Sequence, residues 1–240
     1  MAEGSEVSAP GWPRYVPVAD HALLVSFGDA ISDPTSAAVL GLDRALAQSP
    51  PEGLLECIPA LVNLLIEFDP LVTDHVRIQE AVERLRRLPS PDASTVATRE
   101  VEVCYEGDFA PDIAAVAQAS GLTVDEVIHH HLHGTYQVRM YGFAPGYAYM
   151  AGVPTEIHVP RKAAAVRDIA AGSVLIAGTQ CLVTTLKMPT GWSIIGRSPT
   201  AILTRDERAT TPVLFDVGDR VLFKRISLPQ YEARRALTMP

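Results

Sequence analysis

The chain has 240 residues, of which 48% are hydrophobic and 20% charged, a composition typical of a folded globular protein that excludes general disorder. Its formal net charge of −8 offers no basic surface to a phosphate backbone or an anionic membrane, so neither nucleic acid nor membrane is an expected partner. Three widely spaced cysteines, no signal-peptide pattern and no apolar window long enough to span a bilayer together predict a reduced, cytoplasmic protein.

The first 90 residues are expected to form a loose tail, residues 1–13, and a small α+β domain, residues 14–90. Apolar spacing and turn residues divide this domain into strand, helix, strand, strand and helix. The five runs are HALLVSFG, PTSAAVLGLDRAL, LLECIP, LVNLLIEF and HVRIQEAVERLRRL. Asp74 stands before the last run and is a suitable N-cap.

A Pro- and Ser-rich segment, residues 88–98, is the expected linker to a second domain, residues 99–230. This domain opens with the strand REVEVCYEG and two helices, 112–120 and about 124–133. Gly121 stands just past the end of the first helix, and Gly134 is expected to end the second in the left-handed conformation. Thr123 and Glu126 have the spacing of a capping box for the second helix. Beyond Thr135 short β-type runs alternate with Gly and Pro turns, which favours a mostly β domain, a closed barrel with a flanking helical hairpin. The runs are YQVRMYGF, SVLIAG, CLVTTL, WSIIGR, TAILT and RVLFKRI.

A histidine cluster, HHHLH, is the first candidate for chemistry. Asp125, His129 and His133 share one helical face and offer a carboxylate and two imidazoles to a metal ion. The alternative is a solvated helix end, where imidazoles interact well with the helix dipole. A straight column of these residues separates its outer members by about 12 Å, so no metal is predicted.

The sequence motifs for a catalytic nucleophile or for phosphate binding are weak or absent. Ser173 lacks the G-x-S-x-G elbow, Cys181 has no evident activating neighbour, and no P-loop or dinucleotide fingerprint is present. Four segments instead join glycines to an Arg, Gln or aromatic side chain at a turn: GFAPGYAYM, VPRKAAAVR, AAGSVLIAGTQ and MPTGWSIIGRSP. Together they predict a pocket for a small polar anion, although ordinary β-turn chemistry explains any one of them.

Taken in order, these segments resemble the B subunit of the bacterial 5-oxoprolinase, a family also known as allophanate hydrolase subunit 1, which includes a sporulation-kinase inhibitor. Its members carry a histidine near a helix end, then four motifs and a P-G-D-x-V-x-F ending. The motifs are G-F-x-P-G-F-x-Y-L, P-R-R-x-x-P-R, P-A-G-S-V-x-I-A-G-x-Q and S-P-G-G-W-x-x-I-G-R-T-P. The corresponding segments here are His131, GFAPGYAYM, PRKAAAVR, AAGSVLIAGTQ, MPTGWSIIGRSP and DVGDRVLF.

The resemblance implies an α+β, largely β protein in which a small α+β domain precedes a cyclophilin-like β-barrel. It also implies a heteromeric enzyme, formed with a homologous C subunit or allophanate hydrolase subunit 2, that hydrolyses a small C–N substrate. In the oxoprolinase, ATP hydrolysis drives opening of the lactam to glutamate, with ATP bound by this subunit or by its partner. Two alternatives remain open: a protein that inhibits a sensor histidine kinase, and a carboxyltransferase-type subunit of a biotin-dependent enzyme.

Matching positions of the motifs supply the candidate site residues. Arg161 and Arg197 are expected to hold a carboxylate or phosphate, Gln180 a lactam or urea-type amide, and His131 to move a proton near neutral pH. Phe143, Tyr147 and Trp192 complete the substrate site as rings. The chain departs from the family at several places: Ala165-Val166 replace the second P-R, and Thr190 replaces a glycine.

Overall fold

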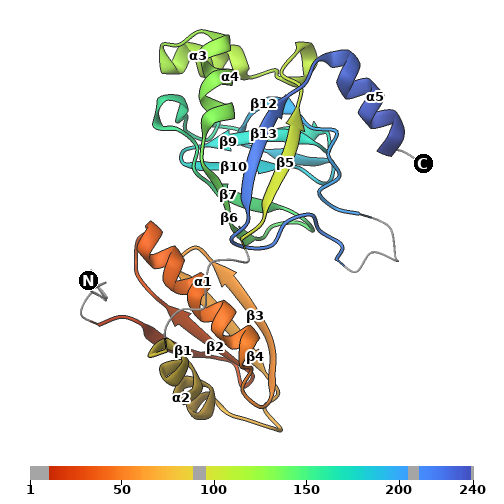
Figure 1. The fold of residues 1–240 in the computed structure, drawn as a ribbon. Helices are drawn as coiled ribbons and strands as arrows, with labels where there is room; N and C mark the ends of the chain where they lie inside the picture. Colours follow the sequence, from red (N-terminus) through yellow and green to blue (C-terminus); the bar gives the residue numbers. More distant parts are fainter. Residues whose placement is uncertain (1–10, 89–95, 205–210, 239–240) are drawn as a thin grey trace, which may run out of the picture. The chain divides into compact units, whose positions relative to one another are not determined.

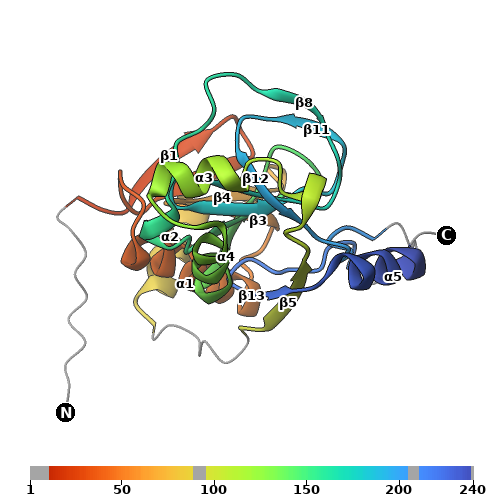
Figure 2. The ribbon, with the colours of Figure 1, turned by 90° about the horizontal axis from the view of Figure 1, so that it is seen from above.

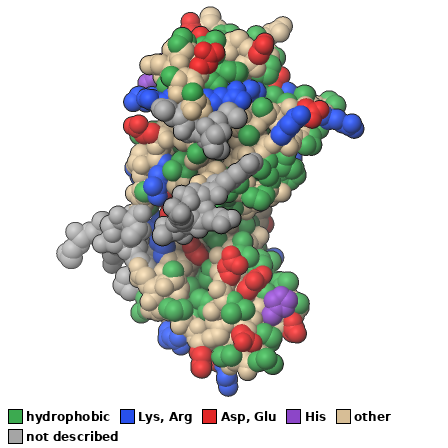
Figure 3. Space-filling view, turned by 90° about the vertical axis from the view of Figure 1, so that its right-hand side faces the viewer, with side chains coloured by type: hydrophobic (Ala, Val, Ile, Leu, Met, Phe, Trp, Pro, Cys, Tyr) green, Lys and Arg blue, Asp and Glu red, His purple; other side chains and the backbone are tan. Residues whose placement is uncertain are grey.

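The computed structural model describes residues 11–88, 96–204 and 211–238 and divides into two compact units, Met1–Thr95 and Val96–Pro240 (Figure 1). The division falls inside the predicted linker, 88–98, most of which lies outside the described residues, as does most of the predicted tail. On the face shown in Figure 3, acidic and basic side chains are interspersed with hydrophobic ones in both units. Among the described helices, none combines the length and the apolar character needed to cross a membrane.

The first unit is a four-stranded antiparallel sheet with the strand order β1-β2-β4-β3 and two helices. Its elements are β1 (Arg14–Val18), β2 (Ala22–Ser26), α1 (Asp33–Gln48), β3 (Leu54–Ala60), β4 (Asn63–Phe68) and α2 (His75–Arg86). Alternation along β4 turns Leu64, Ile66 and Phe68 into the core with the apolar sides of both helices. One apolar face on each element therefore suffices to build this layer.

Side-chain caps fix where the helices of the first unit begin. Ser32 accepts a hydrogen bond from the Thr35 N–H, and Asp74 accepts one from the Arg77 N–H, as expected for Asp74. The order differs from the expectation in one respect, because β1 precedes the predicted strands. Pro17 lies within β1, which is an edge strand, and an edge is where a strand tolerates a residue without an N–H.

The second unit contains most of the strands. Its elements are β5 (Thr98–Val103), η2 (Gly107–Phe109), α3 (Ile113–Ser120), α4 (Val124–His133), β6 (Tyr136–Tyr141), β7 (Ala148–Ala151), η3 (Thr155–Ile157), β8 (Val166–Ile169), β9 (Ser173–Ala177), β10 (Gln180–Val183), β11 (Met188–Thr190), β12 (Ser193–Arg197), β13 (Arg220–Arg225) and α5 (Leu228–Thr238). The main sheet runs β5-β13-β6-β7-β10-β9-β12, and only the β5–β13 pair is parallel among the pairs described in this unit. In Figure 2, β8 and β11 lie side by side as a separate two-stranded sheet, and α3 lies beside β12.

The two outer strands of this order are linked just past the end of β5. The Cys104 N–H donates to the Arg197 carbonyl at 2.8 Å, and the Arg197 N–H donates to the Cys104 carbonyl at 2.9 Å. One face of the sheet packs on the main core, to which every strand of the order contributes at least one buried apolar side chain. The opposite face is free to carry a separate cluster, which forms the candidate site below.

Three details of the second unit correct the sequence-based expectations. The chain continues into helix α5, whose start is capped where the Ser227 N–H donates to Gln230 Oε1 at 2.8 Å. Gly134 ends α4 in an extended rather than left-handed conformation, and glycine is needed there for close packing, since a Cβ would lie 2.6 Å from the Tyr136 ring. The run TAILT contributes a single bridge, Leu203 to Val213, instead of a strand.

Gly152 provides a stability test of the second unit. Its φ is +111°, and a Cβ there would overlap the carbonyl oxygen of Thr135, whereas Gly178 has φ +54° and open space around its Cα. We expect Gly152→Ala to lower the free energy of unfolding by about 3 kcal/mol or more, and Gly178→Ala by about 1 kcal/mol. Urea unfolding of the two variants measures the difference. Equal losses would show that the backbone at Gly152 relaxes at little cost.

Candidate functional site

The candidate site lies on strands β7, β10 and β9, at the level where β12 begins. It occupies the face of the sheet opposite the main core, which is called the outer face below. Gln180 pairs with Ala151 of β7 on one side and with Ala177 of β9 on the other. The register Ser193 to Ile176 puts Trp192 opposite Ala177. Gln180 and Trp192 therefore sit on the same level, two strands or about 10 Å apart, on one side of the sheet.

Aromatic rings cover the sheet next to Gln180. Tyr149 of β7 and Trp192 meet edge to face, with ring centroids 5.8 Å apart, and Tyr147 is buried among Leu175 and Leu182. Burial raises the pKa of both tyrosines. These hydroxyls are therefore protonated at neutral pH and act as neutral hydrogen-bonding groups beside an apolar wall.

Arg161 brings a positive charge to this wall. Its guanidinium carbon lies 5.6 Å from the centre of the Trp192 ring, within the range of a cation–π contact. Its charge also lowers the pKa of Tyr149, against the larger opposing effect of burial. Arg161, Tyr149, Trp192 and Gln180 thus combine a cation, an amide and two rings on one exposed side of the second unit.

The loop from Gly142 to Tyr147 has a strained, tight shape. Phe143 and Gly146 have φ values of +70° and +73°, and the Tyr147 N–H donates to the Ala144 carbonyl at 3.0 Å. A non-glycine residue rarely adopts such a φ, and Phe143 does so with 70% of its surface exposed. The loop places the Phe143 ring 5.7 Å from that of Tyr147, beside the wall rather than in a core.

Asp112, which sequence reasoning assigned only to a helix start, holds the segments around Arg161 together. Its Oδ2 lies 2.5 Å from Lys162 Nζ and accepts a hydrogen bond from the Ile194 N–H at 2.7 Å. The Lys162 N–H in turn donates to the Gly191 carbonyl at 2.7 Å. Because its carboxylate is used in this way, Asp112 makes no side-chain cap to α3. The lysine adjacent to Arg161 in VPRK is the feature of the sequence from which this pairing could have been found.

The substituted residue Thr190 also acts on this site. It lies in β11 without a left-handed φ, so the loop differs in shape from one that needs glycine at this position. Its Oγ1 accepts a hydrogen bond from the Trp192 N–H at 3.1 Å. The threonine therefore helps to fix the backbone that carries the Trp192 ring.

His131 lies apart from these residues, on the inner side of the sheet. It is fully buried, its Nδ1 lies 2.7 Å from the Tyr105 hydroxyl, and its Nε2 lies 3.8 Å from Cys181 Sγ. Burial lowers the pKa of His131 to about 3 and raises that of the Cys181 thiol. At neutral pH both groups are uncharged and enclosed by protein.

Arg197 also lies apart from Arg161. Its guanidinium carbon is 4.9 Å from the centre of the Phe109 ring, and its Nε is buried without a hydrogen-bond partner in the described part of the chain. Arg197 lies five positions after Trp192 at the far end of β12, which corresponds to about 16 Å along an extended chain. The structure thus brings together Arg161, Gln180, Trp192, Tyr147 and Phe143, and it does not bring Arg161 and Arg197 to one point.

The helix-end histidines make contacts of their own. His129 and His133 stack with ring centroids 4.1 Å apart, His133 Nδ1 lies 2.7 Å from the His129 carbonyl oxygen, and Asp125 pairs with Arg225 at 3.5 Å. Within the described ranges no three or more His, Cys, Asp or Glu side chains gather closely enough to hold a metal ion.

A family model and known proteins match most of this chain. The model described as "Carboxyltransferase domain, subdomain C and D" matches residues 13–215. The chain is 35% identical to the 5-oxoprolinase B subunit of Bacillus subtilis, over 89% of this chain and 93% of that protein. It is 34% identical to the Escherichia coli O157:H7 protein of the same name, over 75% of this chain and 79% of that protein.

Solved structures show where the same fold occurs. The structure of TTHA0988 matches with a TM-score of 0.75 and 31% identity over 86% of this chain, which spans 40% of that longer protein. The Kluyveromyces lactis urea amidolyase matches with a TM-score of 0.71 over 97% of this chain and 16% of its own length. At 16% identity, the second likeness shows the fold alone.

The buried imidazole predicts a pH dependence of stability. Because the pKa of His131 falls from an ordinary 6.5 to about 3 on folding, the unfolded chain binds the extra proton between these values, and stability falls as pH falls. We expect a loss of about 2 kcal/mol between pH 7 and pH 5. His131→Gln should be less stable at pH 7 but should lack this loss.

Trp192 fluorescence in a Trp12→Phe background follows unfolding of the second unit alone, since these are the only two tryptophans. His129→Gln, which removes an exposed imidazole from the same helix, is the matched control. If the stability of His131→Gln falls with pH as steeply as that of the unsubstituted chain, groups other than His131 cause the pH dependence.

The Asp112–Lys162 pair predicts a measurable coupling. Asp112→Asn keeps an oxygen for the Ile194 N–H but loses the charge, whereas Asp112→Ala loses both. We expect Asp112→Ala to be about 1–2 kcal/mol less stable than Asp112→Asn. In a double-mutant cycle with Lys162→Met, Asp112→Asn should show a coupling of about 1 kcal/mol. Additive effects of the two substitutions would exclude an energetic role for the pair.

Proposed function

Since this chain belongs to the carboxyltransferase domain family, subdomains C and D, and to the family of 5-oxoprolinase B subunits, we propose that it is one subunit of a heteromeric hydrolase for small C–N substrates. The match to 93% of the length of the B subunit of Bacillus subtilis carries this proposal. The substrate would be of the lactam, urea or allophanate type, and ATP would drive the reaction in the complex. The partner would be a homologous C subunit or allophanate hydrolase subunit 2.

We infer further that the main sheet of the second unit is a cyclophilin-like β-barrel. The two hydrogen bonds between Cys104 and Arg197 support closure, because they join the first and last strands of the order. The core enclosed on one face of these strands is also what a small, side-chain-filled barrel requires. The substrate would then bind outside the barrel rather than in its lumen.

Arg161 would bind the substrate carboxylate on the outer face. A guanidinium can form two parallel hydrogen bonds to a carboxylate, and stacking on Trp192 restricts its orientation beforehand. Gln180, two strands from Trp192, would hydrogen-bond the lactam or urea-type amide. Tyr147, Trp192 and the exposed Phe143 would exclude water from the bound substrate, which strengthens both contacts.

His131 would serve this site as a positioning residue. The Tyr105 hydroxyl can donate to Nδ1, which leaves the ring proton on Nε2, facing Cys181. Cys181 follows Gln180 in β10, so this buried contact would fix the strand that presents the amide. Arg197, with its unpaired Nε, remains a candidate anion-binding group, at a place of its own beside Phe109.

A carboxyltransferase subunit is the second candidate function. The description of the family model, which covers residues 13–215, favours it. The same outer face would then bind an acceptor that carries an amide, with Arg161 holding the carboxylate that is transferred or already present.

Reconstitution with the homologous C subunit tests the proposal. The purified complex should consume 5-oxoproline, allophanate or urea in an ATP-dependent way, and Arg161→Ala should lower kcat/KM about 10- to 100-fold through loss of a charge-assisted contact. Gln180→Ala should lower it several-fold. Turnover that requires carboxylated biotin would identify the second candidate.

Arg167→Ala is the matched control, because Arg167 is exposed and lies six residues beyond Arg161. A well-formed complex inactive on all three substrates would exclude the proposed hydrolase. An active complex in which Arg161→Ala and Arg167→Ala behave alike would exclude the proposed substrate site alone.

A further inference from the structure

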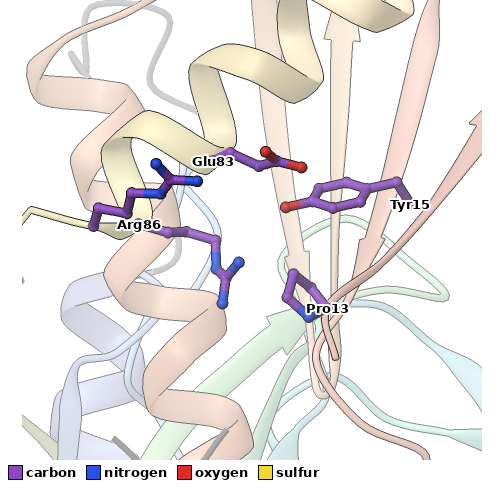
Figure 4. A pocket seen from close by; sticks show the side chains of 5 residues that line it. Pro13, Tyr15, Glu83 and Arg86 are labelled. Atoms are coloured by element: carbon purple, nitrogen blue, oxygen red, sulfur yellow. The ribbon is translucent and has the colours of Figure 1, made fainter. Parts of the chain in front are cut away.

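A cavity of about 310 Å³ lies in the first unit, between β1 and the end of α2. It is lined by Pro13, Tyr15, Glu83, Arg86 and Arg87, and its lining is polar rather than apolar. Figure 4 shows the Tyr15 ring from the sheet facing Glu83 and Arg86 from the helix. None of these residues belongs to the outer-face site of the second unit.

The Tyr15 hydroxyl is the first sign that the cavity has a ligand. The oxygen is buried, and no acceptor for its proton is found in the part of the chain that the structure describes. Burial raises the pKa of Tyr15; Arg86, which approaches the hydroxyl as a hydrogen-bond donor and as a charge, lowers it, and Glu83 raises it. Buried polar atoms nearly always have a partner, and an unsatisfied one at a cavity favours a bound polar molecule.

The arginines at the end of α2 are the second indication that the cavity binds a ligand. The end of α2 carries Arg84, Arg86 and Arg87, and cations at this end interact well with the helix dipole. That explanation serves Arg84, which is exposed and outside the cavity. Among the described residues, Arg86 and Arg87 form no ion pair with a carboxylate, although Glu83 lines the same cavity.

Glu83 restricts the charge of the ligand. One of its oxygens, Oε1, accepts a hydrogen bond from Gln79 at 3.2 Å, which leaves Oε2 for another donor. A dianion such as phosphate would be attracted by the arginines and repelled by this carboxylate. A molecule with separated negative and positive ends satisfies both, because each end can meet a group of opposite charge.

We propose that this cavity binds a free α-amino acid. Its carboxylate lies against the guanidinium groups of Arg86 and Arg87, its ammonium against Glu83, and the Tyr15 hydroxyl donates to the carboxylate. The volume is at the lower end of the range for small-molecule sites, as suits a ligand of this size. The site is independent of the proposed hydrolase, whose lactam or urea-type substrate lacks a free ammonium group.

Isothermal titration of the full chain at low ionic strength, with glycine, L-glutamate, acetate and inorganic phosphate as probes, tests the assignment. We expect saturable binding of an amino acid that is at least tenfold tighter than that of acetate or phosphate. Arg86→Ala should weaken it at least tenfold and Tyr15→Phe a few-fold. Glu83→Gln should weaken amino-acid binding and strengthen acetate and phosphate binding.

Two matched variants show whether amino-acid binding depends on the cavity itself. Arg84→Ala removes a charge from the same helix end outside the cavity, and Arg161→Ala removes the cation of the outer-face site, so both should bind the amino acid as the unsubstituted chain does. Thermal unfolding of every variant shows whether the first unit still folds. The proposal is overturned if neither amino acid binds, if phosphate binds more tightly, or if Arg84→Ala and Glu83→Gln have equal effects.

Discussion

The carboxylate of Asp112 is the constraint on which the outer-face site depends. It fixes the start of β12 through the Ile194 N–H and the segment after Arg161 through Lys162. Neither Trp192 nor Arg161 lies in a regular element, so without these contacts each would be carried by a loop alone. A site needs its groups held to within a fraction of an ångström, and a partly buried charged hydrogen bond supplies that restriction.

Strand alternation separates this face from the buried polar groups. Gln180 and Leu182 point outward, while Cys181 and Val183 point into the core, so two neighbouring residues of β10 have unrelated environments. His131 reaches Cys181 from the inner side and is uncharged there. Residues that share one sequence motif can therefore contribute to binding or to packing, depending only on the parity of their position.

Much of the fold could be predicted from local patterns. Asp74 and the Thr123–Glu126 box gave helix starts correctly, because a cap depends on residues within one turn. The left-handed conformation expected at Gly134 was wrong, since this glycine serves close packing against the Tyr136 ring, which lies outside α4. Strand β1 was missed because a short edge strand with a proline has little pattern of its own.

The site was harder to predict than the fold. Motifs identified Arg161, Gln180 and Trp192 as residue types, but the partner of Lys162 lies fifty residues earlier in the chain, beyond the reach of any local pattern. The same holds for Arg197, whose neighbour Phe109 is far from it in sequence. Distances between motifs follow from sheet register, which a single sequence does not specify.

The parallel pairing of β5 with β13 governs the order in which this protein can form during synthesis. Residues 98–103 leave the ribosome early, yet their ladder partners are residues 220–225, more than a hundred positions later. The elements of the first unit all lie before residue 95 and have no such delay. The nascent second unit must therefore keep a strand edge open until its last strand emerges, and an unpaired strand edge is a site of misassociation during that interval.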